Sequence, residues 1–191
     1  MDLLRAPVNA SDHVNGLRTA PVVMVEYGDY ECPYCVAAHE VVKELQSLLG
    51  SSMCFIFRNF PLTNEHPHAF DSAALAELAA TEDKFWEVHD AIYERPNNLS
   101  FPLLESIAKS FSISVSEFRE AYLNKKILEK IRNDADGGLQ SGVRGTPTFF
   151  INGRRYEGSF DVRAVSAFIN DQVIPHSDGD RSIQPSKTHS T

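Results

Sequence analysis

Two of the three cysteines in this chain are separated by only two residues, in the stretch Tyr30-Glu31-Cys32-Pro33-Tyr34-Cys35. The run before them, Val22–Val25, is short, apolar and rich in β-branched residues, which is typical of a buried strand. After the pair, apolar residues recur at helical spacing up to Gly50, and glycine commonly follows the end of a helix. Residues Met53–Arg58 form a second apolar run. The sequence therefore predicts strand, cysteine pair, helix and strand, with the cysteines at the start of the helix.

Such a pair can hold a metal, form a structural disulfide, or exchange electrons. A structural zinc site needs four ligands, but the third cysteine, Cys54, lies alone in an apolar run where a buried, unreactive thiol is expected. The seven histidines are scattered, and the nearest pair, His66 and His68, has no second cysteine pair to join. A secreted disulfide scaffold would carry more cysteines, in an even number. We therefore expect no metal and favour redox chemistry.

A redox dithiol needs one thiol that ionises near neutral pH and a second that can close a disulfide with it. Cys32 at a helix N-terminus meets the first need, because unpaired backbone N–H groups and the helix dipole favour a thiolate. Cys35 lies one turn further along the same helix face. Pro33 in the first turn costs no hydrogen bond and stiffens the loop.

Glu26 follows the first apolar run directly. By strand alternation it can point beneath the cysteine helix, where a partly buried carboxyl group could exchange a proton with Cys35. It can equally end the strand in water, and the sequence leaves both alternatives open.

The middle of the chain is helical in pattern. Residues 1–20 are polar with little periodicity and predict a loose lead-in. From 63 to 140 the apolar spacing stays near that of a helix. Ser114–Glu117 has the spacing of a capping box. Gly137 and Gly138 are expected to weaken the last helix of this block.

Strand signals return with the apolar run Thr148–Ile151. Asn152-Gly153 predicts a two-residue hairpin after it, and Asp161 can cap a final helix. Pro147 stands where a strand would begin, although proline donates no strand hydrogen bond. A cis Thr146–Pro147 bond that exposes the Thr146 backbone to a substrate and a plain trans turn are both compatible with these residues.

Taken in order, these stretches resemble the DsbA-like thiol–disulfide oxidoreductases of the thioredoxin superfamily, in the bacterial branch with a GDYECPYC-type motif. The matching pieces lie within residues 25–175: VEYGDYECPYC, FRNFPL, HPHA, FWEVHD, GVRGTPTFFING and YEG. The resemblance implies an α/β fold of thioredoxin type, β-α-β followed by β-β-α, with an inserted all-helical block. The expected division is a core from residues 1–62 and 141–175, a helical insertion from 63–140, and a disordered tail from 176–191.

The resemblance also implies a role for each matched site residue. Cys32 would attack a substrate disulfide, and Cys35 would resolve the mixed disulfide. Thr146 and Pro147 would form the cis-proline loop that faces the cysteines and binds substrate, and Glu26 takes the position of the family's buried acid.

Pro33 and Tyr34 between the cysteines are expected to tune the pair. Strong periplasmic oxidases of this family carry Pro-His there, and the histidine helps to stabilise the thiolate. Tyrosine carries no charge, so we expect a reduction potential below that of DsbA.

Charge and composition limit the partners. Lysine and arginine number 18 against 26 acidic residues, a net charge of −8, which argues against nucleic acid or an anionic membrane as a partner. No run approaches the ~20 apolar residues of a membrane span. The first residues lack the apolar segment of a signal peptide, which predicts a cytoplasmic location; a trimmed periplasmic form would read the same way.

The expected partners are proteins that carry disulfides or thiols, together with a redox partner that resets the pair. No bound cofactor is expected, because the electrons reside on sulfur. Two alternatives remain at this point: a non-catalytic binding or chaperone module with the same fold, and a metal-binding CxxC protein. In a reducing cytoplasm the pair would be mostly dithiol and could act as a reductase.

Overall fold

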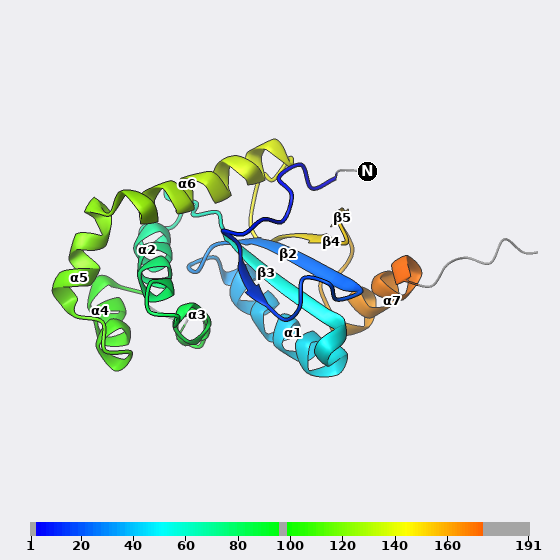
Figure 1. Cartoon of the computed structure of the whole chain (residues 1–191), viewed down its shortest axis with the longest axis horizontal. Helices are drawn as coiled ribbons and strands as arrows, with labels where there is room; N and C mark the ends of the chain where they lie inside the picture. Colours follow the sequence, from blue (N-terminus) through cyan, green and yellow to red (C-terminus); the bar gives the residue numbers. More distant parts are fainter. Residues whose placement is uncertain (1–2, 96–98, 174–191) are drawn as a thin grey trace, which may run out of the picture.

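A mixed five-stranded sheet forms the centre of the molecule (Figure 1). The computed structural model describes residues 3–95 and 99–173. The strands lie in the order β1-β3-β2-β4-β5; β2 and β3 are parallel, and the other neighbours are antiparallel. Their bounds are β1 (His13–Asn15), β2 (Val22–Gly28), β3 (Met53–Asn59), β4 (Thr148–Ile151) and β5 (Arg154–Tyr156). The α/β fold of thioredoxin type is therefore confirmed, with β1 added at one edge.

Helices cover both faces of this sheet, as strands buried on both sides require. α1 (Pro33–Leu49) connects β2 to β3 and packs with α7 (Val162–Val173) on one face. The helices between β3 and β4 are α2 (Ala69–Ala80), α3 (Phe85–Tyr93), α4 (Phe101–Ser110), α5 (Val115–Glu120) and α6 (Lys125–Gln140). Short 3-10 turns are η1 (Gly50–Ser52) and η2 (Ala121–Leu123). Figure 1 shows α2 to α5 gathered beside the sheet, and α6 running from them back across its other face.

α6 approaches the sheet closely at the two glycines that were expected to weaken it. A Cβ atom at Gly137 would lie 2.9 Å from the Cβ of Ala6, and one at Gly138 would lie 2.8 Å from the ring of Phe60. Glycine costs about 1 kcal/mol relative to alanine inside a helix. The close packing of α6 on the N-terminal segment and the end of β3 requires that small size.

Two predicted helix caps are confirmed. The Ser114 hydroxyl accepts a hydrogen bond from the Glu117 N–H at 3.1 Å, and the Glu117 carboxylate accepts one from the Ser114 N–H at 2.9 Å. The Asp161 carboxylate accepts a hydrogen bond from the Ala164 N–H at 2.9 Å, at the start of α7. Each cap satisfies backbone donors that the first helical turn leaves free.

The hairpin between β4 and β5 is also confirmed. Asn152 and Gly153 both have positive φ, 48° and 78°, as the tight two-residue turn requires. The predicted disordered tail, 176–191, lies outside the described residues.

The N-terminal segment is ordered, so the prediction of a loose lead-in was wrong. β1 pairs with β3 in antiparallel register, with His13 opposite Phe57. Leu3 forms an isolated bridge with Arg154. These partners are distant in the sequence, and local periodicity carries no signal for such pairing.

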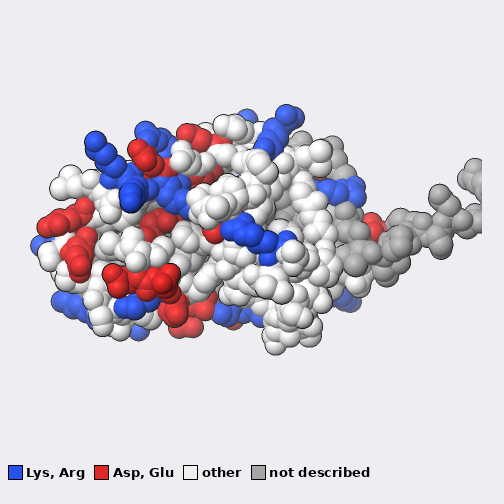
Figure 2. All heavy atoms as spheres, viewed as in Figure 1, with Lys and Arg blue, Asp and Glu red and all other residues white. Residues whose placement is uncertain are grey.

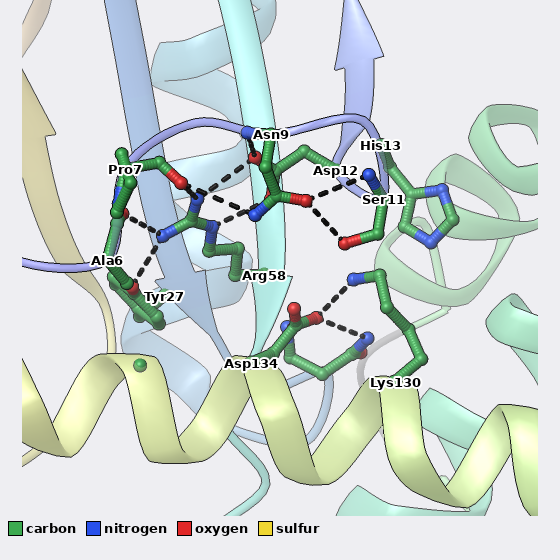
Figure 3. A network of polar contacts seen from close by, with 12 residues as sticks. Ala6, Pro7, Asn9, Ser11, Asp12, His13, Tyr27, Arg58, Lys130 and Asp134 are labelled. Carbon is green, nitrogen blue, oxygen red and sulfur yellow. Dashed lines mark hydrogen bonds and ion pairs between the residues drawn. The ribbon is translucent and has the colours of Figure 1, made fainter.

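A buried arginine holds this segment on the sheet (Figure 3). Arg58 on β3 is 2% exposed, and its Nε and Nη2 atoms donate to the Asp12 carboxylate at 2.8 and 2.9 Å. Its other three N–H groups donate to Ala6 O at 2.8 Å, Pro7 O at 2.9 Å and Tyr27 Oη at 2.7 Å. All five guanidinium donors therefore have partners. Although burial raises the pKa of Asp12, the hydrogen bonds from Arg58 outweigh it and hold this pKa below its ordinary value.

On the face drawn in Figure 2, acidic side chains lie mainly over the left part, and basic side chains lie in separate groups. In the two described ranges, no helix combines the length and the apolar character that crossing a bilayer demands.

We expect Asp12→Ala to lower the free energy of unfolding by about 3 kcal/mol or more, because it leaves the buried Arg58 guanidinium without its counter-ion. Urea denaturation measures the change. The matched control is Glu105→Ala, which breaks the outlying pair with the largely exposed Arg119 and should cost less than about 1 kcal/mol. Equal losses in the two variants would contradict the assigned role of Arg58.

Candidate active site

The cysteine pair lies at the N-terminus of α1, directly after β2 ends. Cys32 is the N-cap residue, with extended backbone angles of φ −71° and ψ 120°, and Pro33 is the first helical residue. Cys35 lies in the first turn, where its Sγ accepts a hydrogen bond from the Asp29 N–H at 3.4 Å. The Cys32 residue is 4% exposed and Cys35 is 0% exposed. Access to the pair is thus through Cys32.

The loop before β4 meets Cys32 across 114 positions of sequence. Cys32 Sγ lies 3.2 Å from the backbone carbonyl oxygen of Thr146, to which it donates when it is protonated. The Thr146–Pro147 peptide bond is cis. Thr146 Oγ1 is buried and has no hydrogen-bond partner among the described residues. The structure therefore brings together the cysteines and the loop that the sequence singled out.

The pKa values of the two thiols are shifted in opposite directions. The pKa of Cys32 is lowered to about 5, chiefly by a hydrogen bond from the Cys35 thiol; hydrogen bonds from the N–H groups of Cys35 and Tyr34 add to this, whereas burial opposes it. Burial raises the pKa of Cys35 well above its ordinary value, and its hydrogen bond to Cys32 and the charge of Glu26 raise it further. At neutral pH Cys32 is a thiolate and Cys35 a thiol, which is the division of labour that thiol exchange uses.

Glu26 points beneath α1, the first of its two alternatives. It lies between Phe57 of β3 and Phe149 of β4, is 2% exposed, and its Oε1 has no hydrogen-bond partner among the described residues. Burial raises the pKa of Glu26 to about 8, with a further contribution from the Cys32 charge. The carboxyl group is therefore mostly protonated at pH 7.

Asp29 and His66, for which the sequence predicted no role, also form part of the site. His66 Nδ1 lies 2.8 Å from Asp29 Oδ2. The same oxygen accepts a hydrogen bond from the Leu62 N–H, and Asp29 Oδ1 accepts one from the Glu31 N–H, both at 2.8 Å. Both residues lie in stretches that carry the family resemblance, GDYECPYC and HPHA, but no local pattern indicates that they contact each other.

A groove of about 340 Å³ lies beside Cys32. It is bounded by α1, by the Thr146–Pro147 loop and by the segment before α7, and its lining is Tyr34, Ala37, Ala38, Thr146, Pro147 and Phe160. Tyr34, the second residue between the cysteines, is 74% exposed at its edge. The groove is therefore a mainly apolar surface next to the reactive sulfur.

Two other places in the structure carry side chains of types that can bind metals. His39, His89 and Asp90 place ligand atoms within 4.8 Å of one another, and burial lowers the pKa of both imidazoles. The Lys43 ammonium lies 2.6 Å from the Asp90 carboxylate, however, so an ion pair already occupies that ligand and we assign no metal there. Cys54 is fully buried on the opposite face of the sheet, and burial raises the pKa of its thiol.

The family described as thioredoxin matches residues 9–171, most of the chain. Among curated proteins, the chain is 41% identical over 167 residues to the Na(+)/H(+) antiporter NhaA 1 of Salinispora arenicola, and 34% identical over 173 residues to one of Mycolicibacterium vanbaalenii. Each match covers 87% of this chain. The chain spans only about a quarter of the length of these relatives, 26% and 28%, and their name describes the whole protein.

Solved structures share the fold. BdbD of Bacillus subtilis superimposes with a TM-score of 0.77 at 22% identity, covering 90% of this chain and 98% of that one. The α-DsbA1 protein of Wolbachia pipientis gives 0.75 at 23% identity, covering 89% and 94%. With the match over residues 9–171, these findings establish that the chain belongs to the thioredoxin family and has the fold of DsbA-like thiol–disulfide oxidoreductases.

Proposed function

We propose that this protein is a thiol–disulfide oxidoreductase that exchanges electrons between the Cys32–Cys35 pair and protein substrates. The observation that carries the proposal is the placement of the pair: Cys32 is the N-cap of α1 and faces the Thr146 backbone, and Cys35 is fully buried behind it. This placement lowers the pKa of Cys32 to about 5 and raises that of Cys35 well above its ordinary value. A buried structural pair has no need of an ionised sulfur. The family and the fold support the same reaction class.

In the first step the Cys32 thiolate attacks one sulfur of a substrate disulfide. A bond forms between Cys32 Sγ and that sulfur, the substrate S–S bond breaks, and the second substrate sulfur leaves as a thiolate. The apolar groove beside Cys32 and the Thr146 backbone offer surfaces against which an extended substrate segment can lie. The substrates are therefore proteins that present a disulfide or a thiol on an accessible segment.

In the second step Cys35 loses its proton and attacks Cys32 Sγ, so that the Cys32–Cys35 disulfide forms and the reduced substrate leaves. Glu26 is the proton acceptor in this proposal. The mixed disulfide removes the negative charge on Cys32 that helps to raise the pKa of Glu26, so the carboxyl group ionises more readily at the moment when Cys35 must lose a proton. Oxidation of a substrate runs these steps in reverse, and a separate redox partner resets the pair.

Exchange of Cys32 and Cys35 for serine tests the reaction. Cys32→Ser should abolish the reduction of insulin disulfides, and Cys35→Ser should accumulate mixed disulfides that non-reducing gel electrophoresis detects. Cys54→Ala is the control and should retain turnover, because Cys54 is buried on the opposite face of the sheet. Full activity of Cys32→Ser would exclude the proposed function, and an inactive wild-type protein would favour a non-catalytic binding module.

We expect a reduction potential between that of thioredoxin, about −270 mV, and that of DsbA, about −120 mV. The attacking thiol has a pKa of about 5, between the thiol pKa of about 7 in thioredoxin and about 3.5 in DsbA. A more stable thiolate stabilises the reduced form. Equilibration with glutathione buffers followed by thiol trapping gives the value, and a potential outside this interval would contradict the assigned acidity of Cys32.

Glu26→Gln should flatten the dependence of stability on pH. A carboxyl group whose folded pKa is raised to about 8 from 4.5 stabilises the fold fully below pH 4.5, and this contribution is lost as the pH rises through 8. The wild-type protein should therefore lose up to about 1.4 kcal/mol per pH unit from this group across that window, and the variant should not. Urea denaturation at several pH values measures the slope. Glu44→Gln, an exposed position on α1, should keep the wild-type slope.

A further inference from the structure

His66 supplies an ionisable group next to the active-site loop from a separate part of the chain. It lies between β3 and α2, its side chain is 18% exposed, and its Nδ1 is 2.8 Å from Asp29 Oδ2. Because a carboxylate can only accept hydrogen bonds, Nδ1 must carry the hydrogen. The backbone fixes the ring further, since the His66 N–H donates to Leu62 O at 2.9 Å and the Ala69 N–H donates to His66 O at 3.2 Å.

Asp29 connects this histidine to both cysteines. Its backbone N–H donates to Cys35 Sγ at 3.4 Å, and its backbone oxygen accepts a hydrogen bond from the Cys32 N–H at 3.2 Å. The Asp29 side chain is 0% exposed. Its carboxylate accepts hydrogen bonds from the Glu31 N–H of the same loop and from the Leu62 N–H of the segment after β3. Asp29 therefore links the His66 ring to the segment that positions the sulfurs.

The charges around His66 favour an imidazolium ion. From the loop that precedes α1, Asp29 contacts its ring, and the charges of Glu31 and Cys32 act on it as well. On its own segment lie Glu65 and His68. Burial alone would lower the pKa of His66, but its hydrogen bond with Asp29 and the negative charges of Asp29, Cys32 and Glu31 outweigh this and raise it above the ordinary value.

His68 stands apart from this group, although it is only two residues away. Its Nδ1 lies 3.0 Å from Asp71 on α2, and its backbone N–H donates to Glu31 Oε2 at 2.6 Å. It therefore has its own carboxylate partner, and it makes a matched control on the same segment.

We propose that the His66 imidazolium, held in place by Asp29, supplies a positive charge that helps to stabilise the Cys32 thiolate, a charge that the residues between the two cysteines, Pro33 and Tyr34, do not supply. His66 is a positioning residue, since it acts through the reactive sulfur. The inference rests on the proposed function and adds a group that regulates its nucleophile. At neutral pH the imidazolium stabilises the Cys32 thiolate. When His66 loses its proton, the thiolate is stabilised less and becomes more nucleophilic.

The test is the rate at which iodoacetamide alkylates Cys32 in the reduced full chain, followed by peptide mass spectrometry between pH 3 and pH 10. The wild-type protein should show a first rise near pH 5, where the thiolate forms, and a second rise above pH 6.5, where His66 titrates. Glu26 titrates near pH 8 in the wild type and in every His variant, so its contribution is common to all the profiles and does not count as the second rise. His66→Gln should lose the second rise and shift the first upward by about 0.5 pH unit or more. His68→Gln should keep both.

His66→Lys separates charge from structure, because it retains a cation that does not titrate below about pH 9. It should restore the first rise to near pH 5 and show no second rise in the neutral range. A wild-type profile without a second rise, a His66→Gln profile that coincides with the wild-type one, or a His66→Lys variant that behaves like His66→Gln would each overturn the inference. The first of these outcomes does not depend on the folding of any variant.

Alkylation requires no turnover, so the two proposals fail separately. A wild-type protein with a two-step profile but no insulin-reducing activity would reject the proposed function and keep the imidazolium assignment. An active protein with a single-step profile that His66→Gln leaves unchanged would keep the proposed function and reject the imidazolium assignment.

Discussion

The site depends on the burial of β2 on both of its faces. A parallel neighbour such as β3 can be reached only through a crossover, and the helix of that crossover must cover one face of the sheet. α1 therefore begins directly beyond the carboxyl end of β2, with Cys32 at its N-cap. The unpaired N–H groups of that first turn then point toward the sulfur, and the same packing encloses Cys35 completely.

Two carboxyl groups near the end of this strand have different surroundings and so different functions. Asp29 accepts hydrogen bonds from two backbone N–H groups and pairs with His66, which keeps the active-site loop in place. Glu26 lies between aromatic side chains with one oxygen unpartnered, so burial raises its pKa to about 8. The first group suits a fixed structural charge, and the second suits a group that gives and takes a proton near neutral pH.

Local features were predicted well because they depend on neighbouring residues. The Ser114–Glu117 capping box, the turn at Asn152-Gly153 and the end of α1 at Gly50 all follow from side chains and φ angles within a few positions. The N-terminal segment was predicted wrongly for the opposite reason. Its order comes from β1 pairing with β3 and from the buried Arg58–Asp12 contact, whose partners lie 46 positions apart. A polar stretch that is fixed by one distant arginine has no periodic pattern to reveal it.

The sequence by itself determined the chemistry of the pair: two thiols one helical turn apart, the first at a helix N-terminus, in a chain whose element order is that of a thioredoxin-like fold. The tertiary structure alone decided what surrounds them. It brought Thr146 to Cys32 across 114 positions and His66 to Asp29 across 37, and it turned Glu26 into the core and away from water. The physical reason is that backbone geometry and capping act over one or two turns of chain. Burial and the pairing of charges depend on segments that only the packing of the sheet and its helices brings together.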